Sequence, residues 1–129
     1  MKHFVIVLVL LLMPLSVSAT EIKCSIRPAK DTPASDLPSL AKVSQADAQK
    51  TALARIKAPS TAVAEGEFEV EQGCLVYSFD IRIPDKPGIE EIMVDAGTGK
   101  VLSHNHESTK QEAAEKAKDK ASSKKPNQP

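Results

Sequence analysis

The residues best suited to chemistry lie between residues 92 and 108, in the segment IMVDAGTGKVLSHNHES. His104 and His106 are separated by one residue, so on a β-strand their imidazoles project to the same side and can reach one metal ion. Glu107 would then point to the opposite side. Two ligands are few for a tight metal site. The alternative is a pair of exposed polar residues at a strand end, and the sequence leaves both interpretations open.

A catalytic site is not predicted. The sequence has no HExxH or Gly-x-Ser-x-Gly motif, and GTGK at residues 97–100 lacks the spacing of a phosphate-binding loop. Asp95 and Glu91 can lie near one another on a strand, but paired carboxylates are common on solvated sheets. We therefore expect a protein that is not an enzyme and that needs no cofactor.

The two cysteines, Cys24 and Cys74, suggest a disulfide. An even number of cysteines in an exported chain is typical of such a bond. It would connect an N-terminal arm to the start of a strand and contribute roughly 2–4 kcal/mol. The alternative is two separate thiols. Their spacing does not fit a zinc finger or a CxxC motif.

Residues 1–19 are typical of a secretory signal peptide. Lys2 precedes the apolar run FVIVLVLLLM, and Val17 and Ala19 are the small residues of a signal-peptidase site. We expect the mature chain to begin at Thr20, to reside in the periplasm or outside the cell, and to have no stable membrane span. A retained N-terminal anchor is the alternative.

The composition of the mature chain limits its partners. Removal of Lys2 with the signal peptide leaves 16 basic and 17 acidic residues, and the chain has no tryptophan. This balance argues against nucleic acid as a partner. The charge is uneven, with −5 over residues 44–107 and +3 over residues 108–129.

The hydrophobic pattern predicts one helix followed by four strands. SQAD at residues 44–47 is a capping signal for an amphipathic helix that Pro59 ends. Alternation with period two indicates strands within residues 61–73, 74–84, 89–96 and 101–107. Residues 20–43 are expected to be a flexible, extended arm or linker, and residues 108–129 a polar tail that is partly helical or disordered.

These elements predict an α+β fold. One amphipathic helix would cover one face of a four-stranded antiparallel sheet and leave the other face in water. The expected core is small and alternates along the strands. It comprises Ala48, Ala52, Leu53, Ile56, Phe68, Val70, Leu75, Tyr77, Phe79, Ile81, Ile92, Val94 and Leu102.

An acidic row precedes the second strand. Glu65, Glu67, Glu69 and Glu71 alternate with apolar residues or glycine. The row is interpreted either as the solvated face of an edge strand, where charge discourages pairing between sheets, or as an acidic surface for a basic partner. The lysine-rich tail is interpreted as solubilising, because its interleaved acids weaken contact with anionic lipid.

Three segments resemble the PepSY domain family. They are SQADAQKTALARIKAPS at residues 44–60, VYSFDIRI at residues 76–83 and EEIMVDAGTGKVL at residues 90–102, of which the last is the most specific. The resemblance assigns a PepSY-like domain to residues 44–107 and implies a cystatin-like roll. The family occurs in propeptides of thermolysin-like metallopeptidases and in stand-alone exported proteins. It implies inhibition or modulation of peptidases and supplies no catalytic residues.

The preferred hypothesis is an exported, non-enzymatic binding module. It would inhibit or modulate a peptidase, or bind a peptide, through surface contacts that include an edge of the sheet. The alternative is a structural or weakly metal-binding envelope protein that uses His104 and His106.

Overall fold

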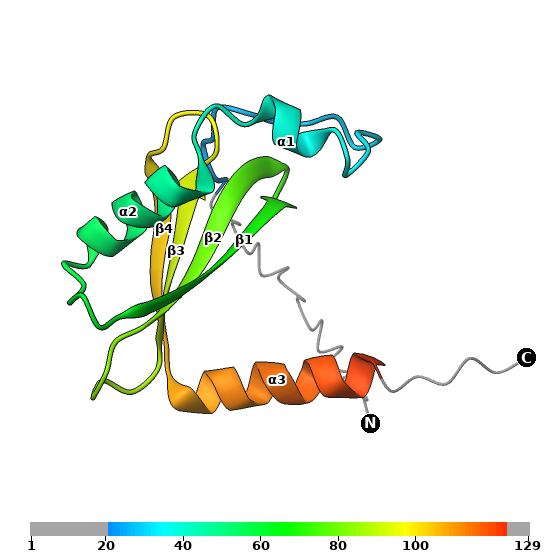
Figure 1. The fold of residues 1–129 in the computed structure, drawn as a ribbon. Coiled ribbons are helices and arrows are strands. Elements are labelled where there is room, and N and C mark those ends of the chain that lie inside the picture. The colour runs from blue at the N-terminus through cyan, green and yellow to red at the C-terminus, as the bar shows by residue number, and fades with distance from the viewer. Residues whose placement is uncertain (1–20, 124–129) are drawn as a thin grey trace, which may run out of the picture.

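A computed structural model describes residues 21–123, so the predicted signal peptide at residues 1–19 lies outside the described residues. The chain forms α1 (Leu37–Leu40), α2 (Gln45–Arg55), β1 (Val63–Glu71), β2 (Cys74–Arg82), β3 (Ile89–Asp95), β4 (Val101–Glu107) and α3 (Thr109–Ser123). The predicted α+β fold is confirmed: helices pack on one four-stranded antiparallel sheet (Figure 1). Among these residues, no helix has the length and apolar character needed to cross a membrane.

The sheet is a meander in the order β1-β2-β3-β4, so β1 and β4 are its edges. Gln72 and Gly73 both have positive φ, 50° and 78°, and connect β1 to β2 by a tight turn. Such angles match the twist of a two-residue hairpin. The pairing of Phe79 with Ile92 and of Tyr77 with Val94 then brings the apolar residues of β2 and β3 to one face.

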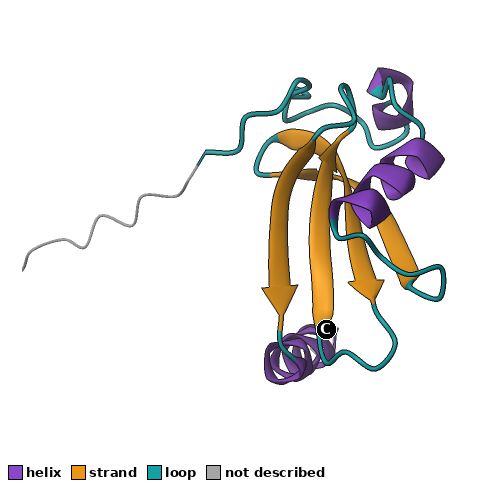
Figure 2. Cartoon of the chain, turned by 90° about the vertical axis from the view of Figure 1, so that its left-hand side faces the viewer, coloured by secondary structure: helices purple, strands orange, loops and turns teal. Residues whose placement is uncertain are grey.

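The inner face of the sheet is the face that α2 covers (Figure 2). Ser44 caps α2 by accepting a hydrogen bond from the Asp47 N–H, as the capping signal predicts. Ala48 and Ala52 have no exposed surface and let the helix approach the strands closely. A Cβ at Gly66 would lie 2.6 Å from the Phe79 ring, so this position requires glycine.

The prediction of the inner core is wrong for two residues, Val70 and Leu102. Val70 is 44% exposed because it lies on edge strand β1 beside the turn, with a neighbouring strand on one side only. Leu102 does not join Ile92 and Val94. An irregularity in the β3–β4 pairing inserts Leu102 between the pairs Met93–Ser103 and Val94–Val101, so Val101 packs on the inner core instead. The shift follows from the single extra residue of a β-bulge.

The outer face is the face opposite α2. The prediction that the fold leaves this face in water is wrong at both of its ends. At one end, Cys74, Val76 and Met93 form a second buried cluster under Ile22 and Cys24. At the other end, α3 lies across the sheet below the end of β4 (Figures 1 and 2). The outer face is therefore open to solvent mainly between the N-terminal arm and α3.

The segment expected to be an extended arm contacts the sheet at several points. Ile26, Leu37 and Val43 pack against the inner core. The Leu75 N–H donates to the Ile26 carbonyl over 3.0 Å, and the Val43 N–H donates to the Ala96 carbonyl over the same distance. These contacts hold residues 21–43 against the β-sheet that carries the candidate site residues.

Candidate functional site

The two histidines are positioned by β4 and meet a carboxylate that the sequence analysis did not single out. His106 pairs with Glu90 across the β3–β4 ladder, and His104 pairs with Ile92. His104 Nε2 lies 2.8 Å from Glu90 Oε2, and His106 Nδ1 lies 2.9 Å from Glu90 Oε1. An ionised carboxylate only accepts hydrogen bonds, so both ring nitrogens donate to Glu90.

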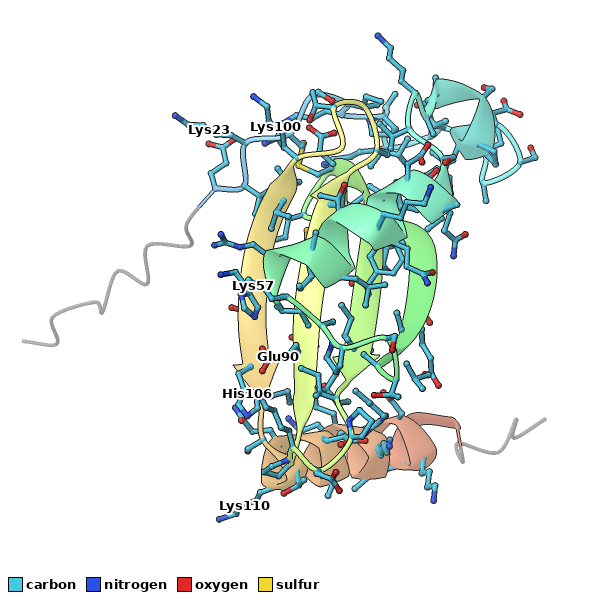
Figure 3. All side chains as sticks on the ribbon, turned by 60° about the vertical axis from the view of Figure 1, so that its left-hand side comes forward. Lys23, Lys57, Glu90, Lys100, His106 and Lys110 are labelled. Atoms are coloured by element: carbon cyan, nitrogen blue, oxygen red, sulfur yellow. A yellow bond between two sulfur atoms is a disulfide. The ribbon has the colours of Figure 1, made fainter. Side chains whose placement is uncertain are left out.

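The side chain of Glu90 is partly exposed to solvent. Burial raises the pKa of the Glu90 carboxyl, but hydrogen bonds from His104 and then His106 outweigh burial and hold the pKa below its ordinary value. Glu90 and His106 can be seen side by side in Figure 3. Glu90 is recognisable in the sequence only after the β3–β4 register is known, because fourteen and sixteen positions separate it from the histidines.

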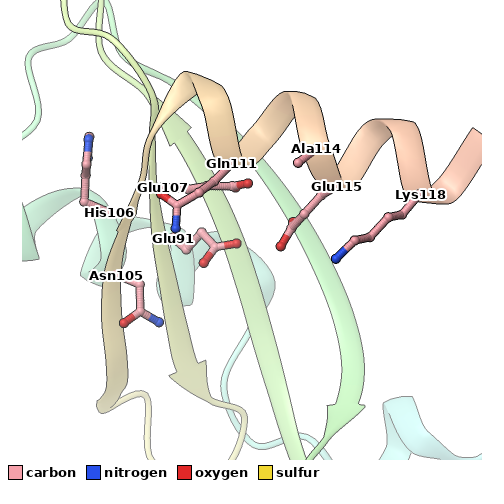
Figure 4. Close-up of a pocket in the computed structure, with 8 residues that line it drawn as sticks. All are labelled: Glu91, Asn105, His106, Glu107, Gln111, Ala114, Glu115 and Lys118. Atoms are coloured by element: carbon pink, nitrogen blue, oxygen red, sulfur yellow. The ribbon is translucent and has the colours of Figure 1, made fainter.

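The predicted two-histidine metal site has one feature in its favour and one against. The imidazoles do lie on one side of β4, as period-two geometry requires, and Glu107 lies on the other side (Figure 4). However, within residues 21–123 no group of three or more His, Cys, Asp or Glu residues is arranged to hold a metal ion. Metal binding by His104 and His106 stays a prediction.

Asp95, a candidate reactive carboxylate in the sequence, acts as a structural acceptor. Its side chain receives the Ser25 N–H at 2.9 Å, the Ser25 hydroxyl at 2.7 Å, the Gly97 N–H at 2.9 Å and the Thr98 hydroxyl at 3.1 Å. Burial raises the pKa of Asp95, but the donors outweigh it and hold the pKa below its ordinary value. This cluster, the Asp95 clasp, joins the β3–β4 turn to the N-terminal arm.

The predicted disulfide between Cys24 and Cys74 is present, with the two Cα atoms 5.8 Å apart. Cys74 has no exposed surface and packs with Val76 and Met93 on the outer face. The bond lies next to the Asp95 clasp along the same arm. Both cysteines are therefore structural and neither carries a reactive thiol.

The acidic residues of β1 belong to a wider acidic surface. Glu65 pairs with Asp80, and Asp80 pairs with Glu91, so three neighbouring strands place a carboxylate in one row on the outer face. Burial, followed by repulsion from Glu67 and Glu65, raises the pKa of Asp80. Burial, followed by repulsion from Asp80 and Glu107, raises the pKa of Glu91.

Helix α3 adds further charges at the end of this row. Glu112 receives hydrogen bonds from Arg82 of β2 at 2.5 and 3.3 Å, and one from Lys116 of its own helix at 2.5 Å. Arg82 and then Lys116 lower the pKa of Glu112 to about 2. These interactions attach α3 to the sheet, and the sequence had indicated only a polar, partly helical tail there.

Glu107 is the least expected member of the acidic surface. Only 9% of it is exposed, and its Oε1 atom has no hydrogen-bond partner. Burial raises the pKa of its carboxyl, followed by repulsion from Glu115, Glu112 and Asp80 and by a side-chain hydrogen bond shared with Glu115. The sequence alone gave no sign of this burial, because α3 could not be placed from its polar composition.

The comparison with family models gives one match. Residues 42–105 match PepSY, the "Peptidase propeptide and YPEB domain". The resemblance predicted from the sequence is thereby confirmed, and the chain contains a PepSY domain over these residues. Searches of the curated proteins and of the solved structures found no matching protein. The match includes α2 and the strands as far as Asn105, whereas the N-terminal arm, Glu107 and α3 lie outside it.

Proposed function

We propose that this PepSY-domain protein is an exported, non-enzymatic binding module that modulates a peptidase, or binds a peptide, through surface contacts. The observation that carries the proposal is the PepSY match over residues 42–105, because the family description is that of a peptidase propeptide. The roles of the polar residues support it. Asp95, Cys24 and Cys74 are engaged in structural bonds rather than presented to a substrate.

The proposed location is the periplasm or the medium. Residues 1–19 resemble a signal peptide, and the Cys24–Cys74 disulfide supports an oxidising compartment because cytosolic thiols are kept reduced. Expression in the source cell followed by fractionation and intact-mass measurement tests this. A mature chain that begins at Thr20 and contains the disulfide is expected, whereas a cytosolic chain that retains Met1 would contradict export.

Inhibition of purified peptidases tests the proposed activity. The protein is added to thermolysin-like metallopeptidases from the same organism, and hydrolysis of a quenched fluorescent peptide is followed. A rate that falls with protein concentration and saturates at a fixed stoichiometry is expected. Heat-unfolded, reduced protein is the control, because it offers the same sequence as a competing substrate without the fold. Equal inhibition by folded and unfolded protein, or none by either, would contradict the proposal.

The second candidate function is weak metal binding in the cell envelope. It is favoured by the convergence of His104 and His106 on Glu90, which supplies a third side chain near the two imidazoles. It has less support than the binding module, because the described residues form no group arranged to hold an ion. A zinc titration separates the two candidates.

A further inference from the structure

The strongest unexplained feature is a groove on the outer face between the sheet and α3. Two cavities of about 450 and 320 Å³ lie along it, and Glu107 and Glu115 line both. These volumes fall within the lower part of the range for ligand pockets, about 300–1,000 Å³. We call this region the acidic groove. Its carboxylates are Glu65, Asp80, Glu91, Glu107, Glu112, Glu115 and Asp119.

One oxygen of Glu107 in the acidic groove lacks a hydrogen-bond donor, although the carboxyl shares a hydrogen bond with Glu115. The side chain of Glu107 points from the end of β4 toward α3, and Glu115 points back toward it from the helix (Figure 4). Buried polar atoms in proteins are nearly always hydrogen-bonded, since an unmet acceptor costs free energy. Glu107 Oε1 has no partner in the described part of the chain. A donor from outside these residues would remove that cost.

The carboxylates that line the acidic groove outnumber its lining cations, which are Arg82, Lys116 and Lys118. Arg82 and Lys116 both form ion pairs with Glu112, and the attraction of Arg82 lowers the pKa of Asp80 by less than burial and the neighbouring acids raise it. No ion pair among residues 21–123 involves Asp80, Glu91 or Glu107. The pKa of each of these three carboxyls is raised, first by burial and then by neighbouring acids. A bound cation would relieve this repulsion.

The arrangement fits an extended cation better than a single metal ion. The described carboxylates include no group of three or more that could coordinate one ion, and they are spread over two adjoining cavities. Arginine side chains suit such a surface, because a guanidinium binds a carboxylate through two parallel hydrogen bonds and carries a long apolar stem.

We propose that the acidic groove binds a basic segment of a partner protein, and that an arginine or lysine of this segment donates to Glu107. This inference rests on the proposed binding function and specifies the chemistry of the partner. Glu65, Asp80 and Glu91 lie inside the matched PepSY range, whereas Glu107 and α3 lie outside it, so the residues that follow the match complete the groove.

Fluorescence anisotropy with a defined peptide tests the proposal without a peptidase. The probe is a fluorescein-labelled pentapeptide in which two arginines alternate with glycines, and its matched control carries citrulline, which has the same shape without the charge. Binding is measured at physiological ionic strength, where surface attraction is screened within about 8 Å. The arginine peptide is expected to bind at least about tenfold more tightly than the citrulline peptide, the ratio that loss of one charged hydrogen bond produces.

Matched variants distinguish the groove from general attraction. Glu107→Gln and the more exposed Glu115→Gln are compared with Asp31→Asn, which removes one negative charge from an exposed site on the arm. The two groove variants are expected to weaken binding about tenfold and Asp31→Asn less than twofold. Equal effects of the three changes, or binding that does not depend on arginine, would overturn the proposal. Tighter peptide binding by Lys124→Gln/Lys125→Gln would also overturn it, by showing that the chain's own tail is the occupant.

The same variants separate this inference from the proposed function. If Glu107→Gln loses the peptide but still inhibits the peptidase, the groove binds a basic segment that is not needed for inhibition. If the wild type inhibits a peptidase but binds no arginine peptide, the groove proposal fails and the proposed function stands. If the wild type binds the arginine peptide but inhibits no peptidase, the groove proposal stands and the proposed modulation of a peptidase fails.

Discussion

Substitution of Asp95 by asparagine tests whether this residue is structural or functional. Each carboxylate oxygen receives one backbone N–H and one hydroxyl, from Ser25, Gly97 and Thr98. Asparagine keeps one acceptor oxygen and turns an NH₂ group toward the other two donors. The hydroxyl can rotate away, but the backbone N–H is fixed and loses its partner. At about 1.5–3 kcal/mol for a hydrogen bond to a charged group, we expect Asp95→Asn to lower the free energy of unfolding by roughly 3 kcal/mol.

Thermal and urea unfolding followed by circular dichroism measures this loss. For a domain of this size, roughly 3 kcal/mol corresponds to a fall in Tm of about 12–24 °C. Asp31→Asn is the matched control and should change the free energy by less than about 0.5 kcal/mol, since Asp31 lies on the surface. Ser25→Ala removes only the hydroxyl and should cost about 1 kcal/mol. An Asp95→Asn protein as stable as Asp31→Asn would refute the structural role and restore Asp95 as a binding candidate.

The pH dependence provides a second check on Asp95. Its folded pKa is held below the ordinary value, so the ionised form is favoured by folding. The resulting stability is fully present above the unfolded pKa of about 3.9 and is lost as the pH falls through the folded pKa. The difference in stability between the wild type and Asp95→Asn should therefore shrink below about pH 4. A difference that stays constant between pH 7 and pH 3 would contradict the assignment.

Three further predictions concern other parts of the site. Reduction of Cys24–Cys74, which closes a loop with a sequence separation of 50, should cost about 4 kcal/mol in urea unfolding, and unchanged stability would contradict this. The pKa of Glu107 is raised in the folded protein, so ionisation of Glu107 destabilises the fold as the pH rises through this pKa. Glu107→Gln should therefore have a higher Tm than the wild type, by a margin that grows over this pH range. A lower Tm for Glu107→Gln would contradict this. Zinc should shift Tm by less than about 1 °C. A larger shift that His104→Ala/His106→Ala removes would favour metal binding.

The parts of the fold that follow from local patterns could be predicted from the sequence. Ser44 and Asp47 mark the start of α2, and the alternation from Leu75 to Ile81 gives the inner face of β2 correctly. The prediction for Leu102 was wrong because one extra residue in the irregular β3–β4 pairing reverses the alternation of faces. The segment VLSHNHE contains no glycine or proline that would indicate this irregularity. Local periodicity is informative where pairing is regular and fails at a bulge.

The candidate site was harder to predict because its decisive contacts join distant residues. Ser25 and Asp95 are 70 positions apart, and neither residue type identifies the other as its partner. The contact of Glu90 with His104 and His106 depends on the β3–β4 register. In both cases the sequence identified polar residues with possible chemistry, and only the packed structure shows which of them already have partners.

The division of polar residues between two faces links the fold to the proposed partner. On the inner side of β4, both histidines satisfy Glu90, and at the turn the arm satisfies Asp95. On the outer face, α3 brings Glu115 toward Glu107 without supplying a donor to its buried oxygen. Glu115 and Asp119 of α3 line the groove beside Lys116 and Lys118 of the same helix, and the Glu107 oxygen without a donor is the acceptor that a basic partner would complete.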